Sequence, residues 1–472
     1  MAPTNSPSAV EREQDLSNPF VHLLVSFRLT HTCFKKCIEN KYKESELNMG
    51  ENSCIDRCVS KYWQVTNLVG QLLGSGRPPI DILVEILTKF PAKSLVQFRC
   101  ISKFFCALID GHGFGVVHRS LSLTLPSRAG ILIAITPRKL FSARCSPAYY
   151  TLNFGEENPR RPGMLQANRL AYLDNAEPFG KGSLRSSSDG LICVYRPNEG
   201  VFVCNVSTGQ LISLPTMQSH SPYLFSSCAL LGFDSLSKRY KVLMIESFEY
   251  KHWVFTVGVD KSWREINYSL SHPFYPFDAY ACPSYSDTSV HIDGVIYSFN
   301  WLSKDDPPNF HIVAFDVGSE RYSLIPFPVE ISSSSSQYQC AIFALGNFAL
   351  LQVDGGRLAI VYVHKIGHLF YMDVWSLEKS KGCSWEKITT VIPFHLIVEQ
   401  SMQSMEYLPF TTNHAGDIVL LCTRTKQFSI LVCNLKSKVW RKFNVGGVKE
   451  FPICYPTDVR MYKTMDNVFS IE

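Results

Sequence analysis

The pattern of apolar and polar residues changes along this chain of 472 residues. Up to about residue 110, apolar residues recur every three or four positions, which is the spacing of an amphipathic helix. From residue 120 onward, short apolar runs alternate with turn residues, and this pattern is typical of β-strands. The sequence therefore predicts a multidomain protein in which two helical segments precede a large all-β domain.

The first helical segment, residues 10–78, carries two cysteine pairs with the spacing C-x3-C. These cysteines are Cys33, Cys37, Cys54 and Cys58. Cysteines four residues apart lie on one face of a helix, and a turn at 48–50 separates the pairs. Two antiparallel helices would then place Cys37 beside Cys54 and Cys33 beside Cys58. We expect a hairpin with two disulfides if the segment is oxidised, and a hairpin with free thiols in a reducing compartment.

The run from Cys33 through Trp63 to Pro79 resembles the small Tim chaperones, most closely their plant Tim-ten branch. Those proteins escort apolar precursors across the mitochondrial intermembrane space. The resemblance implies an oxidised hairpin that assembles with other small Tim subunits. It departs at Asn18-Pro19, because a proline there ends or kinks the first helix that the family uses for its clients.

The second helical segment, residues 79–115, predicts three short helices. Asp81 is a good N-cap, an apolar stripe runs from Ile82 to Phe90, and Pro91 ends the helix. A module this small cannot bury both faces of its helices alone. The surplus apolar surface predicts a constitutive partner or tight docking onto the next domain.

The string from Pro79 to Lys103 closely resembles the plant F-box. Two departures, Pro78 for the usual Leu and Phe105 for the usual Trp, keep apolar bulk at the contact. The resemblance implies binding of a Skp-type adaptor and, through it, a cullin. Carried over position by position, it implies these adaptor-facing residues: Pro79, Ile82, Leu83, Ile86, Leu87, Pro91, Leu95 and Phe98.

The β region, residues 120–465, contains a loose repeat of a strand, a polar turn and a second strand with an aromatic residue. Copies occur at 201–215, 312–328 and 430–440. The outer strands of sheet blades would show this pattern, and closing the blades into a ring protects all but short edges. We predict a β-propeller of about six irregular blades, with a large β-sandwich or an open barrel as the alternative.

Several phrases of this region, in their order, resemble the plant F-box-associated interaction domain. Examples are Ser188–Cys193, Asn205–Gly209, Gly232–Val242, Asp293–Tyr297 and Asp373–Leu377. Most of these residues are turn and core positions. The resemblance therefore identifies a scaffold and reveals no ligand.

Composition and missing motifs exclude several function classes. The net charge is +5, from 46 basic and 41 acidic residues without a basic block, so neither nucleic acid nor an anionic membrane is an expected partner. No apolar stretch nears the ~20 residues that span a bilayer, and Met1–Leu16 does not resemble a cleaved secretory signal. No nucleophile, nucleotide or metal motif occurs, so we expect no catalytic residue, metal or cofactor.

The sequence therefore predicts a non-catalytic substrate-recognition subunit of a Skp–cullin–F-box ubiquitin ligase, in the cytoplasm or nucleus. Its β domain would recruit a protein substrate of unknown identity. The alternative is an intermembrane-space chaperone for the import of inner-membrane proteins, acting through the twin C-x3-C hairpin. The size of the β domain favours the ligase subunit, because that domain would have to cross the outer membrane unfolded. The two helical modules meet at Pro78-Pro79 without a flexible linker, as in a fusion of two genes.

Overall fold

The structure is a computed structural model in which most of the chain from Ile80 to Ile471 is described. The predicted N-terminal hairpin, including its four cysteines, lies outside the described residues except for positions 57 and 60, and Pro79 lies outside them as well. The described residues are 57, 60, 80–100, 103–137, 147–154, 163–174, 179, 183–196, 199–216, 227–246, 251–267, 275–276, 289–301, 310–332, 348–378, 384–393, 409–423, 428–448 and 457–471.

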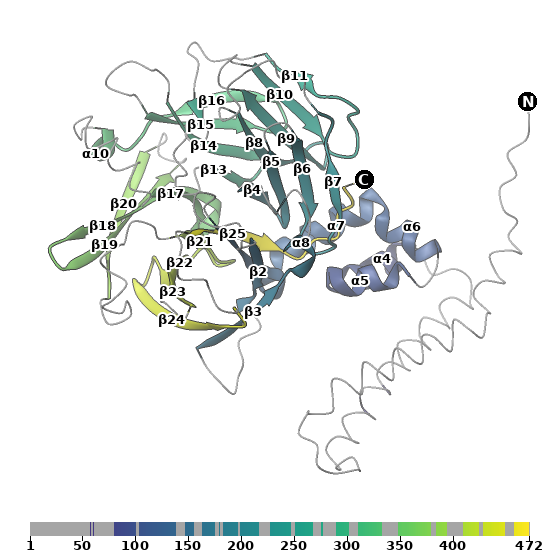
Figure 1. Cartoon of the computed structure of the whole chain (residues 1–472), viewed down its shortest axis with the longest axis horizontal. Coiled ribbons are helices and arrows are strands. Elements are labelled where there is room, and N and C mark those ends of the chain that lie inside the picture. Colours follow the sequence, from purple (N-terminus) through teal and green to yellow (C-terminus); the bar gives the residue numbers. More distant parts are fainter. Residues whose placement is uncertain are drawn as a thin grey trace, which may run out of the picture. The chain divides into compact units, whose positions relative to one another are not determined.

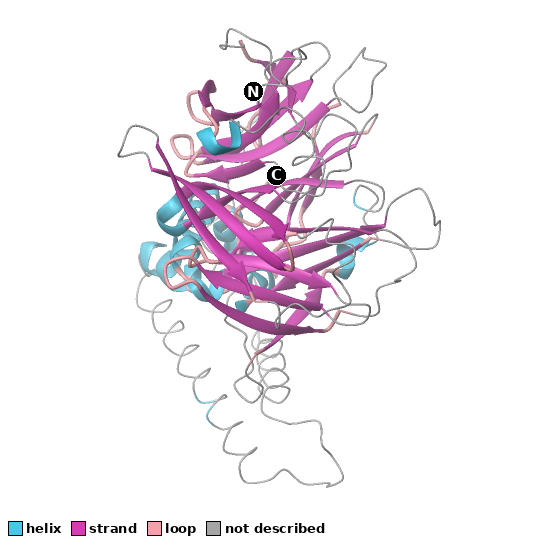
Figure 2. Ribbon diagram, turned by 90° about the vertical axis from the view of Figure 1, so that its left-hand side faces the viewer, coloured by secondary structure: helices cyan, strands magenta, loops and turns pink. Residues whose placement is uncertain are grey.

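Contacts divide the chain into two compact units. The helical unit ends at Phe114, and the β unit contains Gly115 onward together with Pro91–Lys93. Strands dominate the β unit, and helices are few (Figure 2). The main helices are α4 (Ile80–Thr88), α5 (Ala92–Phe98), α6 (Lys103–Asp110) and α7 (His112–Thr124), and the short ones are α8 (Ala171–Asp174) and α10 (Val329–Ser332).

Helix α7 corrects the expectation that helical structure ends near residue 115. It continues to Thr124 and enters the β unit. The sequence hides this helix because Gly113 and Gly115 both disfavour helix formation. Gly115 has a packing reason: a Cβ there would lie 3.1 Å from the Cα of Phe469. The glycine thus lets the last described segment of the chain approach the helix closely.

Within the described residues, the strands form six blades (Figure 1). Each blade is an antiparallel meander whose first strand lies innermost. The first blade contains β25 (Thr457–Met465), β1 (Ala129–Pro137), β2 (Ala148–Leu152) and β3 (Met164–Arg169). The second contains β4 (Ser183–Ser188), β5 (Leu191–Arg196), β6 (Gly200–Asn205) and β7 (Leu211–Ser213), and the third contains β8 (Ser227–Asp234), β9 (Arg239–Glu246), β10 (Lys251–Thr256) and β11 (Arg264–Glu265).

The fourth blade contains β13 (Ser289–Ile292), β14 (Val295–Trp301), β15 (Phe310–Asp316) and β16 (Arg321–Ile325), and the short β12 (Tyr275–Pro276) pairs with β14. The fifth contains β17 (Phe348–Val353), β18 (Arg357–Ile366), β19 (Leu369–Glu378) and β20 (Ser384–Ile392). The sixth contains β21 (Phe410–Thr412), β22 (Ile418–Thr423), β23 (Phe428–Asn434) and β24 (Val439–Gly446).

The two ends of the β unit close the ring. Strand β25, the last in the chain, pairs antiparallel with β1, the first, from Ala129 opposite Met465 to Pro137 opposite Thr457. The inner strands contact one another around the circle: β4 with β8, β8 with β13, β13 with β17, β17 with β21, β21 with β25 and β25 with β4. The architecture is therefore propeller-like, as predicted, rather than a sandwich or an open barrel.

The sequence repeat corresponds to the outer two strands of a blade. Its three copies fall on β6–β7, β15–β16 and β23–β24. Tryptophans of the outer strand regions fasten neighbouring blades together. The Trp263 indole donates to the Pro215 carbonyl at 2.7 Å, and the Trp385 indole donates to the Pro326 carbonyl at 2.8 Å. In both cases the acceptor belongs to the preceding blade, so these two tryptophans tie neighbouring blades together.

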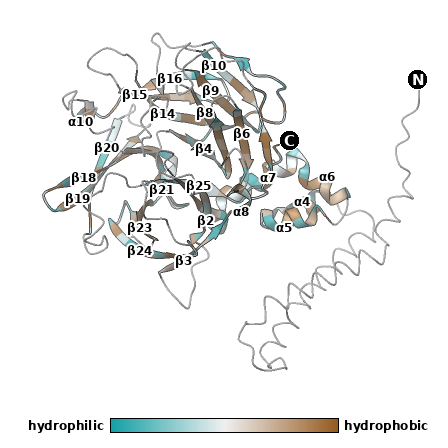
Figure 3. Cartoon of the chain, in the orientation of Figure 1, coloured by the Kyte–Doolittle hydropathy of each residue, from teal (hydrophilic) through white to brown (hydrophobic). Residues whose placement is uncertain are grey.

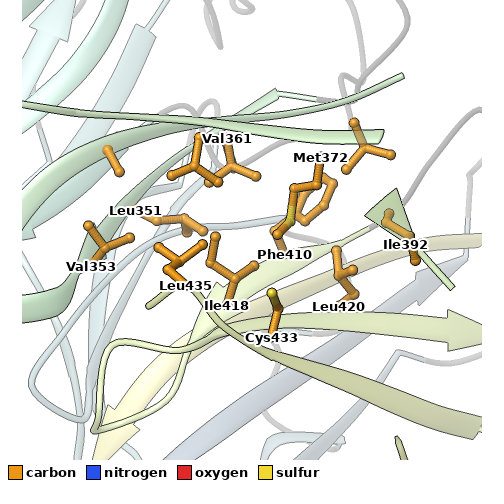
Figure 4. Packing of buried hydrophobic residues seen from close by; sticks show 14 of the residues in the cluster. Leu351, Val353, Val361, Met372, Ile392, Phe410, Ile418, Leu420, Cys433 and Leu435 are labelled. Carbon is orange, nitrogen blue, oxygen red and sulfur yellow. The ribbon is translucent and has the colours of Figure 1, made fainter. Parts of the chain in front are cut away.

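Six apolar clusters fill the six spaces between neighbouring blades. The cluster between the β17–β20 and β21–β24 blades is shown in Figure 4, with Val361 and Met372 facing Ile418 and Leu420. Strands β8 and β9 are apolar along most of their length (Figure 3). Because every blade face is covered by the next blade, the ring buries its core continuously.

Candidate partner-binding surfaces

The helical unit exposes apolar side chains on α4 and α6. Ile80 is 56% exposed, Ile82 is 43% exposed and Phe104 is 51% exposed. Isolated apolar residues on a surface are normal, but exposed Ile82 lies one helical turn before half-buried Ile86, so the two share one face of α4. The helical unit therefore offers apolar area to a partner.

The predicted adaptor-facing residues differ in accessibility. Leu83, Leu87 and Leu95 are buried, Ile86 and Phe98 are half-buried, and Ile82 and Pro91 are exposed. A partner that binds this conformation can contact the exposed and half-buried residues of the set directly. The buried leucines act by holding the helices. Adaptor contact by this set stays a prediction.

Aromatic stacking and one ion pair hold the helical unit together. Phe98 packs edge-on against Phe90 with ring centroids 5.4 Å apart, and it also meets Phe105 at 6.5 Å. Phe105, which stands where the F-box usually has Trp, thus keeps a core contact. Arg99 holds both carboxylate oxygens of Asp110, at 2.9 and 3.1 Å, and so ties the end of α5 to α6. Such bidentate pairs fix geometry as well as charge.

The β unit has a central cavity of about 600 Å³, a size typical of small-molecule sites. Its walls are the inner strands, and its rim is formed by the turns that follow β4, β8, β13, β17 and β21. Helix α7 also contributes to the lining through Arg119, Ser122 and Leu123. The cavity therefore lies at the end of the ring where α7 enters the β unit.

Two aspartate–glycine turns shape this rim. Asp189 and Asp293 have positive φ angles of 51° and 48°, and the following Gly190 and Gly294 have φ angles of 86° and 84°. Two successive residues with positive φ form the type I′ turn that matches the twist of a hairpin. Both turns have the sequence Asp-Gly, and both aspartates line the cavity.

A buried ion pair connects α7 to this rim. The Arg119 Nε donates to Asp189 Oδ2 at 2.9 Å, and the guanidinium lies 3.5 Å above the ring centre of Phe233. Burial opposes the charge on Asp189, but the neighbouring Arg119 outweighs it and holds the pKa of Asp189 below its ordinary value. The pair is thus ionised on both sides and anchors the helix.

Ser188 and His291 meet in the same region but cannot act as a nucleophile and its base. The Ser188 hydroxyl lies 3.0 Å from His291 Nδ1, while His291 Nε2 accepts the backbone N–H of Phe233 at 3.1 Å. Because Nε2 accepts, Nδ1 carries the proton and donates to Ser188. Burial also lowers the pKa of His291. This imidazole is fixed as a neutral donor, so it connects the blades that contain β4, β8 and β13 and does not activate a nucleophile.

Sequence reasoning identified the turn phrases of the rim but not the charged residues that converge there. The sequence did not reveal Arg119 and Lys463 as site residues, because they lie far apart in the chain and belong to no motif. Among the described residues, no group of three or more His, Cys, Asp or Glu side chains could hold a metal ion. No described helix is long and apolar enough to cross a membrane.

Two protein-family models match the part of the chain that follows the N-terminal segment. The F-box associated beta propeller domain matches residues 164–468, and the F-box domain matches residues 79–116. The chain is 26% identical to the F-box protein At1g30790 of Arabidopsis thaliana over 80% of this chain and 92% of that protein. It is 27% identical to the putative F-box protein At3g52320 of the same plant over 67% of this chain and 73% of that protein.

The N-terminal segment has a separate relative. The Tim10/DDP family zinc finger matches residues 24–75. The mitochondrial import inner membrane translocase subunit TIM10 of Arabidopsis thaliana is 70% identical over 53 residues, which are 11% of this chain and 64% of that protein. Four thiolates are a ligand set that zinc accepts, and the same four thiols can form two disulfides when oxidised.

Solved structures resemble the chain only weakly. Hydrazine synthase of Kuenenia stuttgartiensis is 10% identical over 74% of this chain and 49% of that chain, with a TM-score of 0.36. The Dos1 propeller is 6% identical over 56% of this chain and 61% of that chain, with a TM-score of 0.25. Likeness this low carries no argument. The strand pairing and the family match together show that the chain belongs to the F-box proteins with an F-box associated beta propeller domain, preceded by a Tim10/DDP-type segment.

Proposed function

We propose that this protein is the substrate-recognition subunit of a Skp–cullin–F-box ubiquitin ligase. The single observation that carries the proposal is the F-box match at residues 79–116, followed along the chain by the propeller match at residues 164–468. F-box proteins are generally non-catalytic adaptors. In this role the helical unit binds a Skp-type adaptor and its cullin, and the propeller recruits the protein to be ubiquitinated.

The surface chemistry supports this division of labour. The helical unit presents exposed Ile82 beside half-buried Ile86 on α4, and apolar area of this kind drives protein association. The Ser188–His291 pair is held in a tautomer that cannot activate a nucleophile. A role in holding proteins together fits these features better than catalysis. We place this activity in the cytoplasm or nucleus.

A matched pair of substitutions tests the proposal. Ile82→Asp puts a charge on α4, and Val117→Asp puts the same charge on α7 in the β unit. The wild-type side chains are 43% and 46% exposed, so both variants should fold. We expect Ile82→Asp to weaken co-purification with a Skp-type adaptor by about tenfold or more, since a buried unpaired charge is costly. Val117→Asp should bind like the wild type, and unchanged binding by Ile82→Asp would reject the proposal.

A second candidate function rests on the 70% identity of the N-terminal segment to TIM10. In that role the hairpin is oxidised in the mitochondrial intermembrane space, joins other small Tim subunits and shields inner-membrane precursors during import. Thiol alkylation in intact cells distinguishes the two roles. Cys100 is exposed in the helical unit and serves as the internal control for alkylation. Alkylation of Cys33, Cys37, Cys54 and Cys58 as complete as that of Cys100 would end the chaperone proposal.

A further inference from the structure

The cavity of the β unit carries charged side chains of both signs. Four of its lining residues are lysine, arginine or aspartate: Arg119, Asp189, Asp293 and Lys463. Arg119 and Asp189 neutralise each other in the ion pair that anchors α7. The remaining two, one positive and one negative, are therefore the charges that the cavity can offer to a ligand.

Lys463 lies on β25 and points its ammonium at an amide rather than a carboxylate. Its Nζ donates to the Gln352 Oε1 at 3.0 Å, and among the described residues it takes part in no ion pair within 4.0 Å. An ammonium has three donors, so two remain after this bond. Burial lowers the pKa of Lys463, although Asp189 and Asp293 partly offset this effect. A ligand anion would supply the missing partner.

Asp293 is the opposite case. It occupies the turn between β13 and β14, its side chain is exposed, and no described residue forms a hydrogen bond or ion pair with its carboxylate. The neighbouring turn approaches it closely, since a Cβ on Gly356 would lie 3.1 Å from Asp293 Oδ2. Gly355 and Gly356 have φ angles of 67° and 80° and also line the cavity. Two glycines thus leave room around a carboxylate that forms no hydrogen bond and no ion pair within 4.0 Å among the described residues.

The rest of the lining is mostly neutral and rich in hydroxyl groups. Ser188 and Ser289 come from two inner strands, and Thr411 and Thr412 come from a third. His414 stands at the same rim, and burial together with the charge of Lys463 lowers its pKa, so it favours the neutral form. The surroundings therefore suit a polar molecule of no net charge.

We propose that this cavity binds a small zwitterion of the amino-acid type, whose carboxylate meets the Lys463 ammonium and whose ammonium meets the Asp293 carboxylate. The inference goes beyond the ligase proposal and holds whether or not the helical unit binds an adaptor. A ligand with both charges satisfies both groups at once. A dianion would face Asp293 with like charge, and a diamine would face Lys463 in the same way.

Three probes with chains of five carbons separate these possibilities: 5-aminopentanoate, glutarate and 1,5-diaminopentane. The full-length protein is titrated with each, and the His414 imidazole signals are followed by NMR together with binding heat. We expect 5-aminopentanoate to bind about tenfold more tightly than either of the others, because it makes both charge-assisted contacts. Equal or tighter binding of glutarate or the diamine would overturn the inference, as would no binding of any probe.

Two substitutions and one control complete the test. Lys463→Met and Asp293→Asn should each weaken 5-aminopentanoate binding about tenfold. Lys261→Met removes the same charge as the first variant from an exposed turn and should leave the affinity unchanged. If Lys463→Met does not fold, Asp293→Asn still decides, since asparagine tolerates the positive φ of that turn. Wild-type affinity in Asp293→Asn would contradict the proposal.

Discussion

The helical unit and the cavity of the β unit expose opposite kinds of chemistry. The helical unit presents apolar side chains, and its Lys89–Glu85 pair is more than half exposed on both sides. The cavity collects the half-buried charges of Arg119, Asp189 and Lys463 around α7 and β25, and Asp293 is exposed at its rim. Apolar area suits a protein partner, whereas fixed charge in a confined space suits a small polar ligand. The two units thus expose surfaces that suit different kinds of ligand.

The largest expected effect tests whether the buried charges of the cavity rim carry stability. Arg119→Met leaves Asp189 largely buried without its partner and removes the contact with Phe233. We expect the free energy of unfolding to fall by about 3–5 kcal/mol. Urea unfolding of the full chain measures it. A loss below about 1 kcal/mol would mean that the pair behaves like a surface ion pair.

Acid sensitivity should come next and is expected from a buried histidine of the β unit. Burial lowers the pKa of His252 to about 4 from an ordinary 6.5, and its Nδ1 lies 2.6 Å from the Tyr322 hydroxyl. The unfolded chain therefore takes up this proton at a higher pH than the folded chain. Stability that is fully present above pH 6.5 should fall by about 3 kcal/mol as the pH drops toward 4.

His252→Gln isolates this effect from other titrations. Urea unfolding of wild type and variant at several pH values between 7 and 4 gives the difference in stability. That difference should change by about 3 kcal/mol across the window, in the direction that favours the variant at low pH. Parallel curves for the two proteins would show that His252 keeps its ordinary pKa when folded.

A smaller effect is expected where tryptophans fasten the blades. Trp263→Phe removes the hydrogen bond to the Pro215 carbonyl, which should cost about 1 kcal/mol in urea unfolding. Trp385→Phe removes the corresponding bond to the Pro326 carbonyl at an exposed position. It should cost less, since water replaces the lost donor. The reverse order would contradict the assignment of Trp263 to the more protected contact.

The smallest effect lies on the helical unit. Lys89→Met breaks the exposed i,i+4 pair with Glu85 and should change the free energy of unfolding by no more than about 0.5 kcal/mol. The same variant should bind a Skp-type adaptor like the wild type if apolar area governs that contact. A large loss of binding with unchanged stability would instead assign the contact to charge.

Local sequence signals account for most of the fold. The polar turns and aromatic residues of the repeat fall on outer hairpins, as expected, because turn chemistry and strand alternation act over a few residues. The Asp-Gly phrases mark type I′ turns for the same reason. The pairing of β25 with β1 was not predictable in this way, since its partners are separated by most of the β region.

The candidate sites were predictable to different degrees. The F-box residues form one continuous string, so the resemblance placed them directly. Lys463, Asp293 and Arg119 come from three distant segments that only ring closure brings to one cavity. Helix α7 was missed because Gly113 and Gly115 both lower helix propensity, although Gly115 is required for the close packing contact with Phe469.

The central claim is that the adaptor binds the helical unit and leaves the propeller free for recognition. Hydrogen–deuterium exchange of the full chain, with and without a purified Skp-type adaptor, tests it directly. We predict protection over α4 and α5, residues 80–98, and unchanged exchange in the strands from Ala129 to Met465. Protection confined to the strands, or no protection at saturating adaptor, would contradict the account.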